Sequence, residues 1–252
     1  MNRITSPKNG RVKEWKKLNS KKGREKANAY LIEGPHLVEE ALLHHAAISN
    51  LITDESFRIP TNWHTGDITT WVVTSSVIKE LSDTESPQGV IAIVEIEKKP
   101  FEINPQGTYL LIDGIQDPGN LGTIIRTADS AGVDGIILGP GTVDLHNSKV
   151  LRSTQGSLFH IAVITDQLEK WIDRFQREDV IVYGTSLQGG VPYTNENIPH
   201  GFALLLGNEA NGVTTELLKK TNKNLFVPIY GKAESLNVAV AAGILLYGLK
   251  QN

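Results

Sequence analysis

The stretch Tyr109–Ala131 reads YLLIDGIQDPGNLGTIIRTADSA and contains an apolar run, a polar turn and an amphipathic segment. The run Tyr109–Ile112 predicts a strand that is buried on both faces. From Leu121 to Ala128 the apolar residues recur at helical spacing, which predicts a helix over residues 120–131. A strand that turns directly into a helix is the repeating unit of α/β sheets, so this stretch predicts an α/β domain.

The same alternation continues to the end of the chain. Further apolar runs predict strands at Gly135–Leu138, Val180–Tyr183, Phe202–Leu206 and Leu225–Ile229, and Val238–Lys250 predicts a closing helix. Continuous apolar runs are typical of parallel strands that are covered on both faces. The sequence therefore predicts a parallel-sheet α/β domain over residues 108–252.

A second, smaller α/β domain is predicted upstream, over residues 1–97. Its expected elements are strands at Tyr30–Ile32, Asn50–Thr53, Thr70–Val73 and Val90–Glu95, and a helix at His36–His45. Residues 98–107 contain two prolines and end in a glycine between two predicted strands, which predicts a linker.

The composition excludes several kinds of chemistry. The chain contains no cysteine, which excludes disulfides, thiolate zinc sites and cysteine nucleophiles. Its seven histidines show no HExxH or other zinc-binding spacing, so we expect no metal. No apolar run reaches the roughly 18 residues that span a bilayer, and no apolar signal-peptide region follows the basic N-terminus. We therefore expect a cytoplasmic protein without a membrane partner.

The charges are distributed unevenly. Residues 1–30 hold ten Lys and Arg against two Glu, a net charge of +8, within a chain whose net charge is -3. A basic segment on an acidic body is typical of polyanion binding, although a solubilising tail is an alternative. Val12, Trp15 and Leu18 recur on roughly one helical face, which favours a folded basic helix over a loose tail.

Three polar segments follow predicted strands, at the sheet edge where ligands of α/β proteins bind. In the first, Asp117–Gly122, Asn120 is expected to cap the helix, and Arg126 lies off the apolar face, free to meet a phosphate. The alternative is a cap followed by a surface arginine. In the second, Leu206–Glu209, Gly207 allows a close approach, and a carboxylate at this position requires a partner. Glu209 could instead cap the next helix.

The third segment joins Val227–Ile229 through a polar loop to Ser235–Ala239. Ser235 or Asn237 could cap the closing helix, whose alanines and glycine allow close packing against another backbone. By itself this segment is typical of a well-capped buried helix.

Together and in this order, the three segments resemble the SpoU (TrmH-type) branch of the SPOUT RNA methyltransferase superfamily. The resemblance covers about residues 108–250 and includes Lys149–His160. The first 97 residues resemble, through Ile4, Ser6, Asn9 and Ile32–Gly34, the RNA substrate-binding domain often attached to this family.

The resemblance implies S-adenosylmethionine as cofactor, a deep trefoil knot in the C-terminal domain, and a homodimer. It implies methylation of a ribose 2′-hydroxyl in RNA, with rRNA favoured by the separate N-terminal domain. The implied catalytic residues are Asn120, Arg126, Glu209, Ser235 and Asn237. The implied cofactor-binding residues are Thr185, Gly207, Val227, Ile229 and Leu236. The expected RNA-contacting residues are Lys8, Arg11, Lys13, Arg24 and Arg152.

Alternatives stay open at this point. The substrate could be tRNA, the methylated atom could be a base nitrogen, or the chain could be an inactive RNA-binding or ribosome assembly factor on the same fold. Methylation of pyrimidine C5 through a cysteine adduct is excluded because the chain has no cysteine. Arg126 is the family's proposed proton acceptor, but a guanidinium is normally protonated, so a phosphate clamp describes it better.

Overall fold

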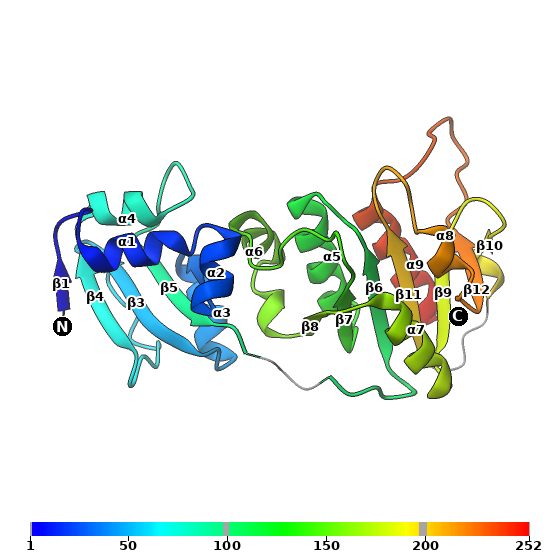
Figure 1. Ribbon diagram of the computed structural model, residues 1–252, viewed down its shortest axis with the longest axis horizontal. Helices are drawn as coiled ribbons and strands as arrows, with labels where there is room; N and C mark the ends of the chain where they lie inside the picture. Colours follow the sequence, from blue (N-terminus) through cyan, green and yellow to red (C-terminus); the bar gives the residue numbers. More distant parts are fainter. Residues whose placement is uncertain (1, 98–100, 197–200, 252) are drawn as a thin grey trace. The chain divides into compact units, whose positions relative to one another are not determined.

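The computed structural model describes residues 2–97, 101–196 and 201–251, and the chain divides into two compact units. Unit 1 contains the described residues up to 97 together with Asp144–Phe159. Unit 2 contains the remaining described residues, up to Val143 and from His160 onward. Figure 1 labels their helices and strands. The predicted linker, 98–107, is described only from Phe101, and its described part contains no helix or strand.

Unit 1 is built on a five-stranded mixed sheet in the order β1-β4-β3-β5-β2. Its strands are β1 (Asn2–Ile4), β2 (Ala29–Glu33), β3 (Ile48–Asp54), β4 (Thr69–Val73) and β5 (Val90–Glu95). Its helices are α1 (Gly10–Lys17), α2 (Lys21–Ala27), α3 (Pro35–Leu43), α4 (Ser75–Leu81) and α6 (Ser148–Thr154), with a 3-10 turn at Ser157–Phe159. The parallel pairs are β1–β4 and β4–β3, while β5 runs antiparallel to both β3 and β2.

The basic N-terminal segment is folded, as its apolar spacing predicts. Asn9 caps α1 by accepting a hydrogen bond from the backbone N–H of Arg11. Val12, Trp15 and Leu18 are buried in one hydrophobic cluster with the inner sides of α4 and the sheet. These buried residues anchor one side of α1 to the sheet. The lysines and arginines of α1 lie on its other sides and face outward.

Unit 2 is built on a seven-stranded sheet in the order β10-β12-β9-β11-β6-β7-β8. Its strands are β6 (Thr108–Asp113), β7 (Gly135–Leu138), β8 (Ala162–Thr165), β9 (Ile181–Thr185), β10 (Val191–Pro192), β11 (Phe202–Gly207) and β12 (Lys223–Phe226). Its helices are α5 (Pro118–Ser130), α7 (Leu168–Arg177), α8 (Thr215–Leu218) and α9 (Val238–Gln251), with a 3-10 turn at Tyr193–Asn195. All of these strand pairs are parallel, which confirms the predicted parallel-sheet α/β domain.

The two faces of this sheet are covered differently. On one face, α9 packs against α5. On the other, Trp171 and Phe175 of α7 pack with Tyr109 and Leu205 from the central strands, and Phe101 joins this cluster. The sheet is thus buried on both sides, which is the physical reason for its continuous apolar runs.

At the polar segments, the start of one helix and the end of one strand differ from the predictions. The N-cap of α5 is Asp117, not Asn120: its carboxylate accepts the N–H of Asn120, so the helix begins at Pro118. The proline at the first helical position explains this earlier start, since its fixed φ suits a helix and it has no N–H to satisfy. β12 ends at Phe226, so Val227–Ile229 belongs to a loop rather than to a strand.

The chain segment Asp144–Phe159, which lies between β7 and β8 in sequence, packs in unit 1. Leu151 and Phe159 lie in a cluster with Leu37 and Val38 of α3. No helix in the described part of the chain is long and apolar enough to cross a membrane.

Candidate active site

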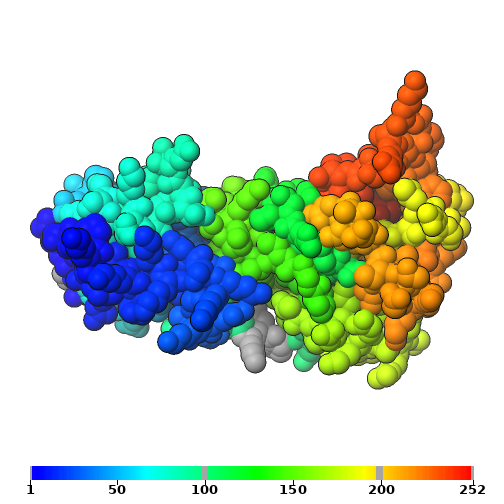
Figure 2. All heavy atoms as spheres, turned by 45° about the horizontal axis from the view of Figure 1, so that its top comes forward, coloured from blue at the N-terminus to red at the C-terminus, as the bar shows by residue number. Residues whose placement is uncertain are grey.

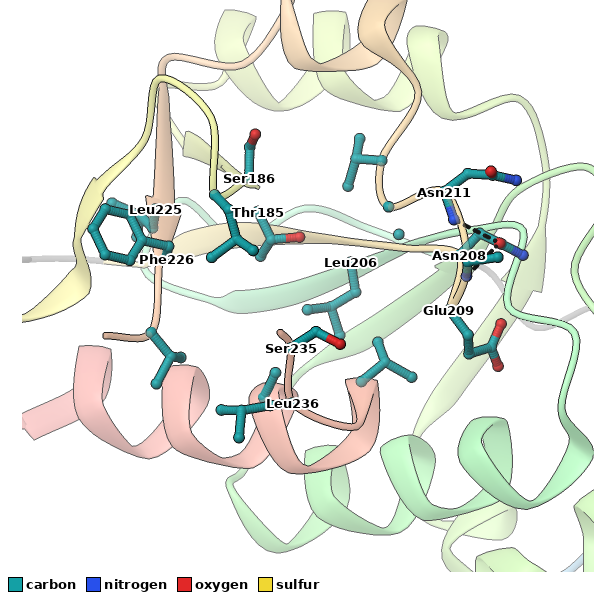
Figure 3. Close-up of a pocket in the computed structure, with 18 of the residues that line it drawn as sticks. Thr185, Ser186, Leu206, Asn208, Glu209, Asn211, Leu225, Phe226, Ser235 and Leu236 are labelled. Atoms are coloured by element: carbon teal, nitrogen blue, oxygen red, sulfur yellow. Dashed lines mark hydrogen bonds between the residues drawn. The ribbon is translucent and has the colours of Figure 1, made fainter. Parts of the chain in front are cut away.

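A pocket of about 840 Å³ lies at the carboxyl ends of the unit 2 strands (Figure 3). The register pairs Gly207, the last residue of β11, with Asp113, the last residue of β6, so the loops that follow these strands start side by side. The pocket is lined by Asn120 in the first turn of α5, by the loops after β11 and β9, and by the loop between β12 and α9. This is the position expected for a ligand site in an open α/β sheet.

The pocket brings together nine of the ten predicted catalytic and cofactor residues. They are Asn120, Thr185, Gly207, Glu209, Val227, Ile229, Ser235, Leu236 and Asn237. The tenth, Arg126, is not among the lining residues. It lies on α5 with an exposed side chain, and no hydrogen bond or ion pair joins its guanidinium to any part of the chain that the structure describes.

The Glu209 carboxylate anchors the first two loops. One oxygen accepts hydrogen bonds from the Asn120 side-chain nitrogen, 3.0 Å away, and from the backbone N–H of Asp117, 3.1 Å away. The other accepts the backbone N–H of Gln116 at 3.2 Å. Burial acts to raise the pKa of Glu209, but these donors and its own N–H outweigh burial and lower it. The group therefore stays a carboxylate at neutral pH and keeps its role as an acceptor.

Asn237 extends this network to the third loop. Its side-chain nitrogen donates to the side-chain oxygen of Asn120 at 2.9 Å. Its own side-chain oxygen accepts the backbone N–H of Ala239, also at 2.9 Å, and caps α9. Because Asn120 donates to Glu209 and accepts from Asn237, its amide has a single orientation. The chain Glu209–Asn120–Asn237 therefore fixes three loops relative to one another.

Asn208, which was not predicted as a site residue, organises the turn after β11. Its side-chain nitrogen donates to the carbonyl oxygen of Gly114 at 2.7 Å, and its oxygen accepts the backbone N–H groups of Ala210 and Asn211. The signal was present in the sequence, because an asparagine that follows a strand-ending glycine is suited to organising a turn.

Gly207 is required by close backbone packing. A Cβ atom at this position would lie 2.1 Å from the backbone of Gly212 and Val213, because the loop after β11 folds back on itself. The glycine was predicted to allow a close approach here, and the approaching group is this backbone.

The remaining lining residues differ in exposure. Thr185 donates its hydroxyl to the carbonyl oxygen of Leu205 at 2.9 Å, which orients the end of β9. Ser235 is exposed, and Leu236 is 37% exposed although its side chain is apolar. The loop that carries them projects from the surface of unit 2 (Figure 2), and Tyr230 within it is 95% exposed. This loop thus presents uncovered polar and apolar groups at the pocket.

The lining fits a nucleoside-type cofactor that carries a positive charge. Its volume lies in the range of small-molecule sites. Leu206, Leu225 and Leu245 supply apolar surface, while Asn120, Ser186 and Gln188 supply polar groups. The lining residues of the described pocket include two glutamates but no lysine or arginine. These properties fit S-adenosylmethionine, whose adenosine is amphipathic and whose sulfonium is cationic.

Unit 1 carries the residues expected to contact RNA. Lys8, Arg11 and Lys13 are exposed at the start of α1, and the Arg11 guanidinium lies 4.7 Å from the centre of the Trp71 ring. Arg152 is 35% exposed, with its guanidinium 4.0 Å from Asp83.

Arg24 differs from this expectation because its side chain is only 7% exposed. It pairs with Asp144 and donates to the carbonyl oxygen of Leu18 at 2.8 Å. Its charge is therefore satisfied inside unit 1 and does not reach the surface.

Two family profiles match the chain, one in each half. The profile of the SpoU rRNA Methylase family matches residues 107–247, and that of the MRM3-like substrate binding domain matches residues 9–92. The chain is 48% identical over 250 residues to the Bacillus subtilis (strain 168) protein named 23S rRNA (guanosine(2553)-2'-O)-methyltransferase RlmP, covering 99% of this chain and 100% of that one.

Solved structures with the same fold include cofactor complexes. An AdoMet-bound rRNA methyltransferase from Sinorhizobium meliloti superimposes with a TM-score of 0.90 at 35% identity, covering 99% of this chain and 97% of that chain. The SpoU methyltransferase AviRb from Streptomyces viridochromogenes, in complex with AdoMet, gives 0.88 at 26% identity, covering 97% and 98%.

Fold and pocket thus define an α/β enzyme of the SPOUT methyltransferase class. Within that class, the chain belongs to the SpoU rRNA methylase family, which confirms the resemblance seen in the sequence.

Proposed function

We propose that this protein transfers the methyl group of S-adenosylmethionine to a ribose 2′-hydroxyl of ribosomal RNA. The observation that carries the proposal is the Glu209–Asn120–Asn237 network at the pocket of a SpoU-family domain. The Bacillus subtilis relative is named as a methyltransferase of guanosine 2553 in 23S rRNA, which makes the corresponding guanosine the first nucleotide to examine.

The residues of the site would position the acceptor ribose and ease the loss of its proton. When bound, S-adenosylmethionine supplies a methyl group that is activated by the positive charge on sulfur. Asn120 and Asn237 hold a fixed polar edge at the pocket, and Ser235 adds an exposed hydroxyl beside it. Such an edge can orient a ribose hydroxyl for in-line attack, and orientation alone contributes a large part of the rate of a displacement.

Arg126 would act from outside the pocket lining. Its free, exposed guanidinium is suited to clamping the phosphate next to the target ribose and to stabilising the alkoxide that develops there. Glu209 would act as a positioning residue, because its carboxylate is occupied by three hydrogen bonds, two from the backbone of the first loop and one from the Asn120 side chain.

The remaining parts of the proposal concern assembly and substrate capture. Unit 1 would bind RNA through Lys8, Arg11, Lys13 and Arg152, and the protein would act in the cytoplasm as a homodimer. Exposed apolar residues on one face of α9, Val240 and Tyr247, are seven positions apart and support a partner surface there. The trefoil knot that the resemblance implies stays a prediction.

Comparison of ribose methylation in cells with and without the gene tests this function. We expect one 2′-O-methylated nucleotide of rRNA to lose its methyl group, detected as a new alkaline cleavage, and to regain it when the gene is restored. Loss of a methyl group from a tRNA nucleotide instead would contradict the proposal that rRNA is the substrate. Calorimetric titration of the purified protein with S-adenosylmethionine separates the enzyme from an inactive assembly factor, which would not bind the cofactor.

A further inference from the structure

The charged residues that line the described pocket differ in their hydrogen-bond partners. Glu209 and Glu234 are the charged residues among the described lining. Glu209 has its carboxylate occupied by donors from the first loop and from the Asn120 side chain. Glu234 is exposed, and no hydrogen bond or ion pair joins its carboxylate to another residue within the described ranges. The Glu209 carboxylate is therefore held by donors within the protein, whereas the Glu234 carboxylate is available to a ligand.

We infer that the Glu234 carboxylate recognises the positive charge of the methyl donor and so makes the pocket prefer S-adenosylmethionine over its own reaction product. The inference rests on the proposed function. In methyl transfer the ribose oxygen forms a bond to the methyl carbon, the electron pair of the broken carbon–sulfur bond stays on sulfur, and the hydroxyl proton leaves to solvent. The sulfonium thereby becomes a neutral thioether, and the cofactor loses one unit of charge.

The position of Glu234 in the loop supports the sulfonium as its target. It directly precedes Ser235, which lies across the cavity from Thr185 and Ser186 in Figure 3. Ser235 and Asn237 belong to the edge that would hold the ribose, so the reacting methyl group must be presented at this loop. A carboxylate here attracts the donor before transfer and loses that attraction afterwards, which favours release of the product.

The size of the effect follows from the exposure of the carboxylate. Two unit charges about 4 Å apart in a solvent-like environment attract with an energy that corresponds to about a fivefold change in affinity. We therefore expect a discrimination of about three- to tenfold, not the thousandfold that a buried pair would give.

Calorimetric titration of the full chain with three ligands tests the inference. The ligands are S-adenosylmethionine, S-adenosylhomocysteine, and sinefungin, which carries an amine in place of the sulfonium methyl group. For Glu234→Gln we expect the Kd of the two cationic ligands to rise by about three- to tenfold and that of S-adenosylhomocysteine to change by less than about twofold. Glu234→Asp keeps the charge and should retain the preference. Glu216→Gln, which removes an exposed acid of α8 outside the pocket lining, is the matched control.

The outcomes are distinct. Equal weakening of all three ligands, or no change for any of them, would overturn the role of Glu234 while leaving the proposed function in place. Failure of the unaltered protein to bind S-adenosylmethionine would contradict the proposed function itself.

Discussion

At the scale of single residues, the proposed role of Arg126 predicts that cofactor binding and methyl transfer can be separated. Its guanidinium is exposed and lies outside the lining of the pocket, so its removal should leave the pocket unchanged. We expect Arg126→Ala to lower the rate of methyl transfer by at least about 100-fold, because a phosphate clamp acts on the RNA at the reacting ribose. The affinity for S-adenosylmethionine should stay within about twofold, as measured by calorimetry.

The controls for this prediction use the same helix. Thr123→Ala removes another exposed side chain of α5 and should keep the activity. Near-normal turnover of Arg126→Ala would remove Arg126 from the catalytic set, and loss of cofactor binding would mean that the substitution disturbs the loop before α5.

His146 gives unit 1 a pH dependence. Its ring lies 4.3 Å from that of Tyr30, and burial lowers its pKa from 6.5 to about 4, although Asp144 acts to raise it and Arg24 adds a still smaller lowering. The unfolded chain therefore takes up this proton first as the pH falls. The free energy of unfolding of unit 1 is therefore not reduced by His146 above about pH 6.5. It falls progressively as the pH is lowered toward 4, by about 1 to 3 kcal/mol.

Urea unfolding at pH 7 and pH 5 measures this loss through tryptophan fluorescence, since unit 1 holds three of the four tryptophans. His146→Phe keeps an aromatic ring against Tyr30 and should make the unfolding free energy less dependent on pH. His64→Phe, at an exposed position, should leave the pH dependence as it is. An identical pH dependence in His146→Phe and the unaltered protein would show that His146 titrates normally.

Residue by residue, the sequence predicted which side chains would lie at one pocket better than it predicted the contacts they make. Glu209 at the end of a buried strand was expected to need a partner, and its partners are the first loop and Asn120. The sequence did not show that Arg24 would be buried. Its partner Asp144 lies 120 positions away, and no local pattern relates two residues at that separation.

At the scale of elements, strands and helices with local apolar patterns were predicted well, and placement in space was not. α7 was missed although Leu168, Trp171, Ile172 and Phe175 have helical spacing and are buried. β1, with three residues, is too short to give a pattern. The packing of Asp144–Phe159 in unit 1 depends on tertiary contacts alone, so it could not be predicted from the segment itself.

The Arg24–Asp144 pair should be a main stabiliser of that packing. Its side chains are 7% and 20% exposed, and removing one partner of such a pair leaves an uncompensated charge. We expect Arg24→Ala to lower the free energy of unfolding of unit 1 by about 3 kcal/mol. Lys13→Ala, an exposed substitution in the neighbouring α1, should change it by less than about 0.5 kcal/mol.

Urea unfolding followed by tryptophan fluorescence compares these variants, with Arg24→Ala/Asp144→Ala completing a double-mutant cycle. The double variant should lose less free energy of unfolding than Arg24→Ala and Asp144→Ala lose in sum. In the double variant neither charge is left without its partner. Additive effects of the two substitutions would show that the pair contributes no coupling.

At the scale of the whole molecule, the fold class could be predicted from the sequence because parallel strands buried on both faces are continuous apolar runs. The meeting of three loops at one pocket did not follow from any single pattern. It requires β6 and β11 to be neighbours, although about 90 residues separate them in the chain, and only the family resemblance grouped residues of the three segments into one site. The sequence likewise placed most of the positive charge in the first 30 residues, and the structure shows which of those charges reach the surface.

This division of charge predicts how RNA binding depends on salt. Each lysine or arginine that contacts a phosphate releases counterions, and the logarithm of the affinity falls with the logarithm of salt concentration by about 0.7 to 0.9 per contact. Replacing Lys8, Arg11 and Lys13 together by Gln should reduce this slope by about 2 to 3. Replacing Lys170, Arg177 and Lys219 by Gln removes the same charge from exposed positions of unit 2 and should reduce it by less. Filter binding of an rRNA fragment from 50 to 300 mM salt would measure both slopes. If the two triple variants changed the slope equally, net charge rather than the α1 surface would capture the RNA.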